Sequence, residues 1–252
     1  MKEKPQLNAV WFWDYDGTLR DKADLNVLND ELYDLLERLQ SSGSRILWNT
    51  ARRIASLEKQ NQKFLDFDGF FVHGTLFWSA KSRKEKLLSP VVPKAYLFKV
   101  CEFMDASRGV DLKFESKPTS IRLVFQSQLE GHSLKELQNR IFLECGAPLG
   151  WRWQLSDRSL ELIPVNFSKT SALEYYYNEF DSKMDYLPVV LGDEVFDRDA
   201  MLWSLERGGW AIQVGSKFKI PAALEENKRF IQFSCASELR EFLTQKKAGF
   251  SS

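Results

Sequence analysis

The chain carries a series of short, continuous apolar runs separated by longer amphipathic segments. The runs are residues 9–13, 45–48, 69–72, 187–191 and 210–214. Because a strand that is buried on both faces reads as an unbroken apolar run, this pattern is typical of a parallel sheet covered on both sides. The alternation of apolar runs with amphipathic segments predicts an α/β fold with a doubly wound, Rossmann-like core.

The amphipathic segments are predicted to be the helices of this core. In the first, leucines recur at helical spacing, and Gly43 ends the pattern. These leucines are Leu25, Leu28, Leu32, Leu35, Leu36 and Leu39. Further helices are predicted at 54–64, 168–180, 195–205 and 236–243.

The middle of the chain interrupts this alternation. After a charged stretch at 81–86, which we interpret as a solvated surface segment, the pattern predicts one helix followed by two alternating strands, and then repeats that order. The predicted elements are helix 94–107, strands 111–116 and 120–126, helix 133–144, and strands 150–155 and 158–163. We therefore predict an inserted cap domain at 80–164, within a core formed by 1–79 and 165–252. At roughly 150 residues per domain, a length of 252 residues fits either one large domain or two small ones, and the insert favours two.

The four cap strands alternate apolar and polar residues, so each has an apolar and a polar face. Trp151 and Trp153 lie on the apolar face, which the two helices can cover, so cap core is a better interpretation for them than sugar stacking. The polar face either meets water or closes over a site. If it closes over a site, its candidate substrate-binding residues are Lys117, Arg122, Arg152 and Glu161.

Composition limits the classes of protein that this chain can belong to. Its 35 basic and 35 acidic residues balance, which argues against a strongly basic nucleic-acid binder. Three dispersed cysteines predict free thiols in a reducing compartment, and two histidines are too few for the usual zinc clusters. No apolar run is long enough for a signal peptide or a membrane span. We expect a cytoplasmic protein.

Polar residues follow the predicted strands, at the edge where ligands bind in open α/β sheets. The first strand runs into Asp14 and Asp16, and the second into Thr50 and Arg52. The strand at 187–191 runs into a third group, Asp193 and Asp197, and Lys169 begins a helix. These side chains are therefore expected to share one crevice.

Several carboxylates gathered this closely would raise one another's pKa values. Mg²⁺ relieves the repulsion, since it binds a few carboxylates and keeps sites for water and phosphate oxygens. Such a site suits a carboxylate nucleophile that attacks phosphorus, and a second carboxylate that protonates the leaving oxygen. Asp197 is a candidate metal ligand or, alternatively, a helix-capping residue. Arg52 is a candidate substrate-binding residue or, alternatively, the partner of a surface acid.

The strand-end residues resemble the motifs of haloacid dehalogenase (HAD) superfamily phosphatases. The order is motif one at residues 14–19 (Asp-Tyr-Asp-Gly-Thr-Leu), motif two at Thr50, motif three at Lys169, and motif four at Gly192, Asp193 and Asp197. The insert between motifs two and three is similar to the type C2 (IIB) cap. Residues 192–201, 160–164 and 214–215 are similar to the trehalose-phosphate and sucrose-phosphate phosphatase group, although Ala51 stands where that group usually has glycine.

The resemblance implies a role for each residue. Asp14 would be the nucleophile and a Mg²⁺ ligand, and Asp16 the acid and base, with its backbone carbonyl on the metal. Thr50 and Lys169 would hold the phosphoryl oxygens. Asp193 would bind Mg²⁺ with support from Asp197.

We therefore expect a monomeric Mg²⁺-dependent hydrolase, a phosphomonoesterase that acts on a small phosphorylated sugar, similar to trehalose 6-phosphate, or on a polyol phosphate. No nucleic-acid or membrane partner is expected. Two alternatives remain open: a non-catalytic phosphosugar sensor on the same fold, and a phosphotransferase to an acceptor other than water.

Overall fold

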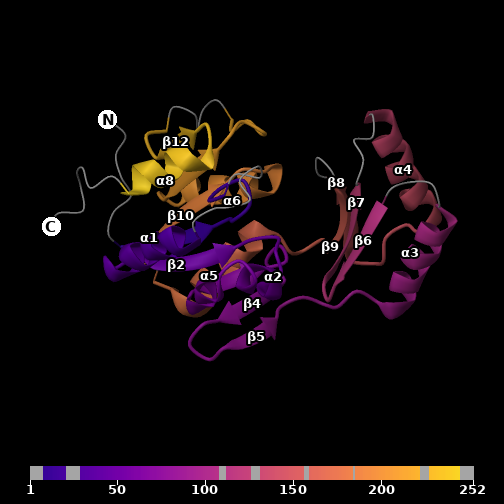
Figure 1. Cartoon of the computed structure of the whole chain (residues 1–252), viewed down its shortest axis with the longest axis horizontal. Helices are drawn as coiled ribbons and strands as arrows, with labels where there is room; N and C mark the ends of the chain where they lie inside the picture. The colour runs from indigo at the N-terminus through magenta and orange to yellow at the C-terminus, as the bar shows by residue number, and fades with distance from the viewer. Residues whose placement is uncertain are drawn as a thin grey trace. The chain divides into compact units, whose positions relative to one another are not determined.

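The computed structural model describes residues 8–20, 29–107, 112–125, 131–155, 159–183, 185–221 and 227–244. The chain divides into two compact units. The core comprises the segments up to Lys86 and from Ser168 onward, and the cap comprises Leu87–Phe167 (Figure 1). The predicted cap limits of 80 and 164 thus differ by a few residues from the limits of this unit.

The core is built on one eight-stranded sheet in the order β12-β11-β10-β1-β2-β3-β4-β5. The first six strands of that order pair in parallel, and β4 pairs antiparallel with β3. The bounds are β1 Ala9–Trp13, β2 Arg45–Asn49, β3 Asp68–Phe71, β4 Leu76–Ser79, β5 Lys84–Leu87, β10 Leu187–Gly192, β11 Trp210–Val214 and β12 Phe230–Phe233. The five predicted strands are all present, and the central position of β1 accounts for its unbroken apolar run.

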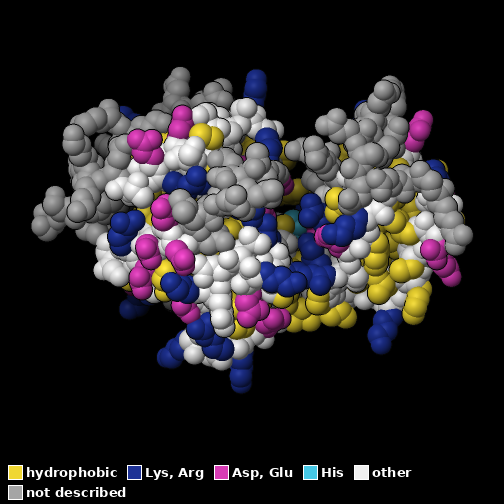
Figure 2. All heavy atoms as spheres, viewed as in Figure 1, with side chains coloured by type: hydrophobic (Ala, Val, Ile, Leu, Met, Phe, Trp, Pro, Cys, Tyr) yellow, Lys and Arg dark blue, Asp and Glu magenta, His cyan; other side chains and the backbone are white. Residues whose placement is uncertain are grey.

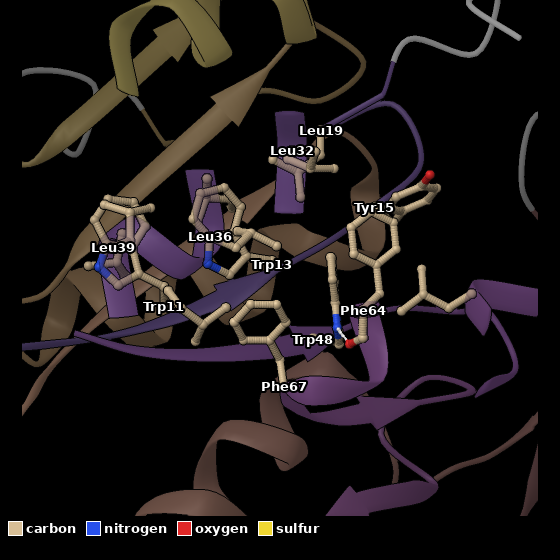
Figure 3. Close-up of a cluster of buried hydrophobic side chains, with 14 of the residues drawn as sticks. Trp11, Trp13, Tyr15, Leu19, Leu32, Leu36, Leu39, Trp48, Phe64 and Phe67 are labelled. Carbon is tan, nitrogen blue, oxygen red and sulfur yellow. Dashed lines mark hydrogen bonds between the residues drawn. The ribbon is translucent and has the colours of Figure 1, made fainter. Parts of the chain in front are cut away.

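Both faces of β1 are buried because helices cover both sides of the sheet. Trp11 and Trp13 point to one face, where their rings stack with centroids 5.3 Å apart and contact the leucines of α1 (Figure 3). Phe12 points to the other face and meets the ring of Tyr176 from α5 edge-on. The bounds of the core helices are α1 Asn29–Ser41, α2 Ile54–Glu58, α5 Lys169–Phe180, α6 Val195–Glu206 and α8 Ala236–Thr244, with a 3₁₀ helix at Gln62–Asp66.

The cap is a second layered unit with its own core. Its sheet has the antiparallel order β6-β7-β9-β8, and both helices lie on one side of that sheet (Figure 1). Trp151 and Trp153 are buried with residues of both helices, which confirms that they belong to the cap core. The bounds are α3 Lys94–Ala106, β6 Leu112–Lys117, β7 Ser120–Phe125, α4 Gly131–Glu144, β8 Trp151–Leu155 and β9 Ser159–Pro164.

The structure corrects some predicted elements. The single helix predicted at 54–64 is wrong, because Asn61 accepts a hydrogen bond from the Lys63 amide (3.0 Å) and starts a separate 3₁₀ turn. Strands β4, β5 and β12 were not predicted. Strand β5 was hidden within the charged stretch because its residues are exposed on both faces. Some predicted helices and strands extend beyond the residues that the structure describes. The predicted positions outside the described residues are Leu25, Leu28, Asp111, Gln126 and Arg158.

The surface charges, the cysteines and the helix lengths each bear on what the composition predicts. Acidic and basic side chains are interspersed over the face of the core drawn in Figure 2. Cys101, Cys145 and Cys235 are free thiols, as predicted. Among the helices that the structure describes, none is long and apolar enough to cross a membrane.

The polar face of the cap sheet contains a buried ion pair that supports a stability prediction. Lys117 Nζ lies 2.7 Å from Glu161 Oε1, and both side chains are less than a tenth exposed. Because Lys117→Met leaves a buried carboxylate without its cation, we expect it to lower the free energy of unfolding by about 3–5 kcal/mol, measured by urea denaturation.

The matched control is Lys113→Met, which removes an exposed pair with Glu115 and should cost about 1 kcal/mol or less. The double variant Lys117→Met/Glu161→Leu should recover most of the loss, since it removes both charges. An equal cost for the two single variants would contradict the prediction.

Candidate active site

Asp14 and Asp16 follow β1 at the carboxyl end of the sheet. The Asp14 amide donates to the Leu191 carbonyl of the neighbouring strand β10 (3.4 Å), and the Asp14 side chain is buried. Tyr15, between the two aspartates, is fully buried against Trp48 and Phe64. Tyr15 anchors the strand end in the core, and because side chains alternate along an extended chain, the two aspartates are turned away from the side that Tyr15 occupies.

Two glycines make room for carboxylates at this edge. Gly17 has a φ of +77°, and a Cβ there would collide with the carboxylate of Asp193. A Cβ at Gly192 would likewise collide with the side chain of Asp197. The backbone therefore approaches both acids so closely that a side chain at either glycine would displace them.

Three buried carboxylates meet at one point. Asp14, Asp193 and Asp197 each offer an oxygen, and these oxygens all lie within 4.8 Å of one another. Lys169 Nζ lies 3.0 Å from Asp14 Oδ1 and also forms an ion pair with Asp197 Oδ1. The predicted group of Asp14, Lys169, Asp193 and Asp197 is therefore brought together in the core.

The burial and close approach of these charged groups shift their pKa values. The pKa of Asp197 is raised to about 7: burial is the main cause, Lys169 opposes the shift, and Asp14 adds to it. Burial, followed by Asp14, raises the pKa of Asp193 to about 6. Burial also acts to lower the pKa of Lys169, but Asp14 and Asp197 outweigh it and the net shift is upward. The site thus retains its ammonium group and resists carrying all its negative charge without a further cation.

The donors fit a hard divalent cation. Carboxylate oxygens are the ligands that Mg²⁺ prefers, and it binds through one or a few of them while keeping water and phosphate oxygens. Three buried carboxylates with convergent oxygens provide such a set of donors.

Asp197 serves two purposes, so both sequence interpretations of it have structural support. Its Oδ2 accepts from the amides of Asp193 (3.2 Å) and Glu194 (3.0 Å), which caps the start of α6. Its Oδ1 faces Lys169. The capping bonds fix the carboxylate, and the second oxygen remains directed at the cluster.

Lys169 is the first residue of α5, and the helix start is well defined. Ser168 caps the helix by accepting from the Ser171 amide (3.2 Å), and the Ser171 hydroxyl accepts from the Ser168 amide (2.8 Å). The buried amide of Asn49, at the end of β2, donates to the Lys169 carbonyl (3.1 Å). The residue before Thr50 is therefore bonded directly to the helix start that carries Lys169.

Asp16 lies apart from the three-carboxylate cluster and is paired with Arg52. Arg52 Nε and Nη2 lie 2.5 and 2.7 Å from the two oxygens of Asp16, and the guanidinium stacks 4.9 Å from the centre of the Tyr15 ring. Arg52 thus pairs with an acid, but the acid is at the site rather than elsewhere on the surface. Thr50 is buried beside it, and its hydroxyl accepts from the Arg52 amide (3.3 Å).

Sequence reasoning missed one cation at the site. Lys217, in the segment after β11, forms an ion pair with Asp193 Oδ2 and lies 3.5 Å from Glu194 Oε1. Its signal was present, because Val214 ends a parallel strand of the same sheet and the residues that follow reach the same edge.

The remaining predicted residues belong to the cap. Glu161 accepts from Lys117 and from the Ser120 hydroxyl (2.9 Å), and Arg122 donates to the Ser159 hydroxyl (3.1 Å). Arg152 is exposed. Lys117 and Glu161 therefore form a buried ion pair with each other, whereas Arg152 is an exposed residue.

The chain matches no protein-family model and no curated protein, but its structure is similar to solved ones. The C-terminal domain of Candida albicans trehalose-6-phosphate phosphatase has a TM-score of 0.74 and 15% identity, over 94% of this chain and 91% of that one. Aspergillus fumigatus trehalose-6-phosphate phosphatase has a TM-score of 0.58 and 14% identity, over 94% and 92%.

A haloacid dehalogenase-like hydrolase from Bacteroides thetaiotaomicron has a TM-score of 0.66 and 12% identity, over 93% of this chain and 98% of that one. Likeness over nearly the whole length of both chains includes the insert as well as the core. The predicted fold class is confirmed: the chain has the haloacid dehalogenase fold, a mostly parallel sheet with an inserted antiparallel cap, and it is structurally similar to trehalose-6-phosphate phosphatases.

Proposed function

We propose that the chain is a Mg²⁺-dependent phosphomonoesterase that hydrolyses a phosphorylated sugar through an aspartyl-phosphate. The observation that carries this proposal is the position of Asp14, whose Oδ1 lies 3.0 Å from Lys169 Nζ within the cluster of three buried carboxylates. A nucleophilic carboxylate needs cations beside it to receive a phosphate dianion, and this position provides them.

Each residue has a defined task in the first half of the reaction. An Asp14 carboxylate oxygen attacks phosphorus, while Lys169 and Thr50 hold the phosphoryl oxygens. Asp16 donates a proton to the sugar oxygen as the phosphorus–oxygen bond of the ester breaks. Mg²⁺, when held by Asp14, Asp193, Asp197 and the backbone carbonyl of Asp16, supplies charge stabilisation to the phosphoryl group.

The second half returns the enzyme to its starting state. Asp16, now ionised, takes a proton from water, and the resulting oxygen nucleophile attacks phosphorus. The bond between phosphorus and Asp14 then breaks and inorganic phosphate leaves. Because both oxygens of Asp16 accept from Arg52 in this structure, that pair has to open before Asp16 can donate a proton.

The proposed leaving group is a sugar or similar polyol. Support comes from the trehalose-6-phosphate phosphatases among the structural relatives, and from the polar face of the cap sheet. Arg152 is exposed and Arg122 is half-buried, so these two residues are stronger candidates for sugar and phosphate contacts than the buried pair of Lys117 and Glu161.

Replacing the nucleophile tests the proposal directly. Asp14→Asn removes the attacking carboxylate oxygen but keeps the shape of the side chain, so hydrolysis of an aryl phosphate should fall by about 10⁴-fold or more. Circular dichroism should show an unchanged fold. The control is Asp199→Asn, which alters an exposed acid on α6 and should keep full activity. Normal turnover by Asp14→Asn would refute the mechanism.

A phosphate-release screen, with and without Mg²⁺, tests the substrate and the metal together. We expect release from trehalose 6-phosphate, sucrose 6-phosphate or mannosyl-phosphoglycerate when Mg²⁺ is present, and none in excess EDTA, because the carboxylates then repel the substrate phosphate. Activity that persists in EDTA would exclude the metal role. Tight binding without release would instead identify a sensor.

A further inference from the structure

A short turn after β3 has no catalytic residue but an unusual backbone. Val72, His73 and Gly74 have φ values of 50°, 58° and 84°, so three consecutive residues lie in the left-handed region. This region is costly for any residue with a side chain and is rarest for β-branched ones such as valine. A strained conformation persists only where the surrounding contacts impose it.

One set of contacts joins the turn to the loop that carries Thr50. The Val72 amide donates to the Arg52 carbonyl (3.1 Å), and the His73 amide donates to the Thr50 carbonyl (3.4 Å). The left-handed conformation of these two residues turns their amides toward the loop. The backbone on both sides of Ala51 is thereby tied to the turn.

A second set joins the turn to the start of α5. A Cβ at Gly74 would lie 2.7 Å from the Ser168 carbonyl oxygen and 3.2 Å from Ala172 Cβ. That same carbonyl accepts the first hydrogen bond of the helix, from the Ala172 amide (3.3 Å). The bare backbone of Gly74 therefore packs on the helical turn that carries Lys169.

A third contact reaches the start of α6. The His73 side chain is buried, and its ring meets Phe196 edge-on with centroids 5.7 Å apart. Phe196 precedes Asp197. One turn of four residues thus touches the segments that carry Thr50, Lys169 and Asp197.

We propose that the turn of residues 72–75 is the positioning element of the phosphate site, and that it fixes the Thr50 loop against the first turn of α5. Gly74 and Thr75 are its positioning residues. This inference rests on the proposed function, since it assigns the turn to a site that holds a phosphoryl group. The strain at Val72 and His73 is then explained, because a relaxed backbone would move their amides away from the Thr50 loop.

Gly74→Ala tests the contact with α5, using inorganic phosphate in the presence of Mg²⁺ as the probe in calorimetry. The added methyl group should displace Ser168 and weaken phosphate binding at least tenfold. The control is Gly146→Ala in the cap, which has a φ of 65° and nothing within 4 Å of the new Cβ. It bears the same kind of backbone penalty, so it should lower the melting temperature and leave phosphate affinity unchanged.

Thr75→Val is a milder variant of the same turn. The buried Thr75 hydroxyl donates to the Val72 carbonyl (2.7 Å), and valine removes that bond at almost constant volume. Phosphate affinity should fall several-fold, and KM for any turned-over ester should rise more than kcat falls. The control is Thr244→Val, which removes a hydroxyl bond at the end of α8.

The outcomes separate the two proposals. Suppose that the wild-type protein binds phosphate, and that the Gly74→Ala and Thr75→Val variants fold and bind it with the same affinity. The turn then does not position the site, although the proposed function stands. If Gly74→Ala does not fold, Thr75→Val decides alone. If wild type binds no phosphate with Mg²⁺ present, both proposals are wrong.

Discussion

The ion pairs between Lys169 and the two acids beside it, Asp14 and Asp197, are the interaction on which the rest of the site depends. All three side chains are buried, and burying one charge without a partner would cost several kcal/mol. The surrounding sequence supports this arrangement. Gly17 and Gly192 leave space for the carboxylates, and the caps of α5 and α6 fix the backbone on which Lys169 and Asp197 stand.

The register of the parallel sheet explains why these groups meet. Trp13, the last residue of β1, pairs with Leu191 of β10 on one side and with Trp48 of β2 on the other. The residues that follow each strand consequently reach the same edge within one or two positions of each other. Asp14, Thr50 and Asp193 are adjacent in space because three strands end level, although they are far apart in sequence.

The same regularity determined what the sequence could predict. The ends of the core strands could be predicted because buried parallel strands are unbroken apolar runs, and this placed Asp14, Asp193 and Asp197 at one edge. Lys169 was predicted to join them from its position at the start of a helix. Lys217 was missed because it lies three residues past the end of β11 rather than directly after it, although the strand itself was predicted to end at this edge. The turn at 72–75 was also missed, since glycine permits a positive φ at position 74 but valine and histidine do not indicate one at positions 72 and 73. Strand β5 was missed because all its residues are exposed and so show no alternation of buried and exposed positions. The end of the helix before Asn61 was missed because it depends on one capping hydrogen bond.

Charge balance distinguishes the core site from the polar face of the cap. Across the cap sheet, Glu115, Arg122, Glu161 and Gln154 stand opposite one another in register, so charges of opposite sign already neighbour each other. Lys117 adds a further cation to Glu161 at 2.7 Å. In the core, by contrast, three carboxylates share two ammonium groups, and the pKa values of Asp193 and Asp197 are raised. The charges on the cap face are thus already paired with one another, whereas the crowded carboxylates of the core would be stabilised by one more cation, which is what the proposed Mg²⁺ would supply.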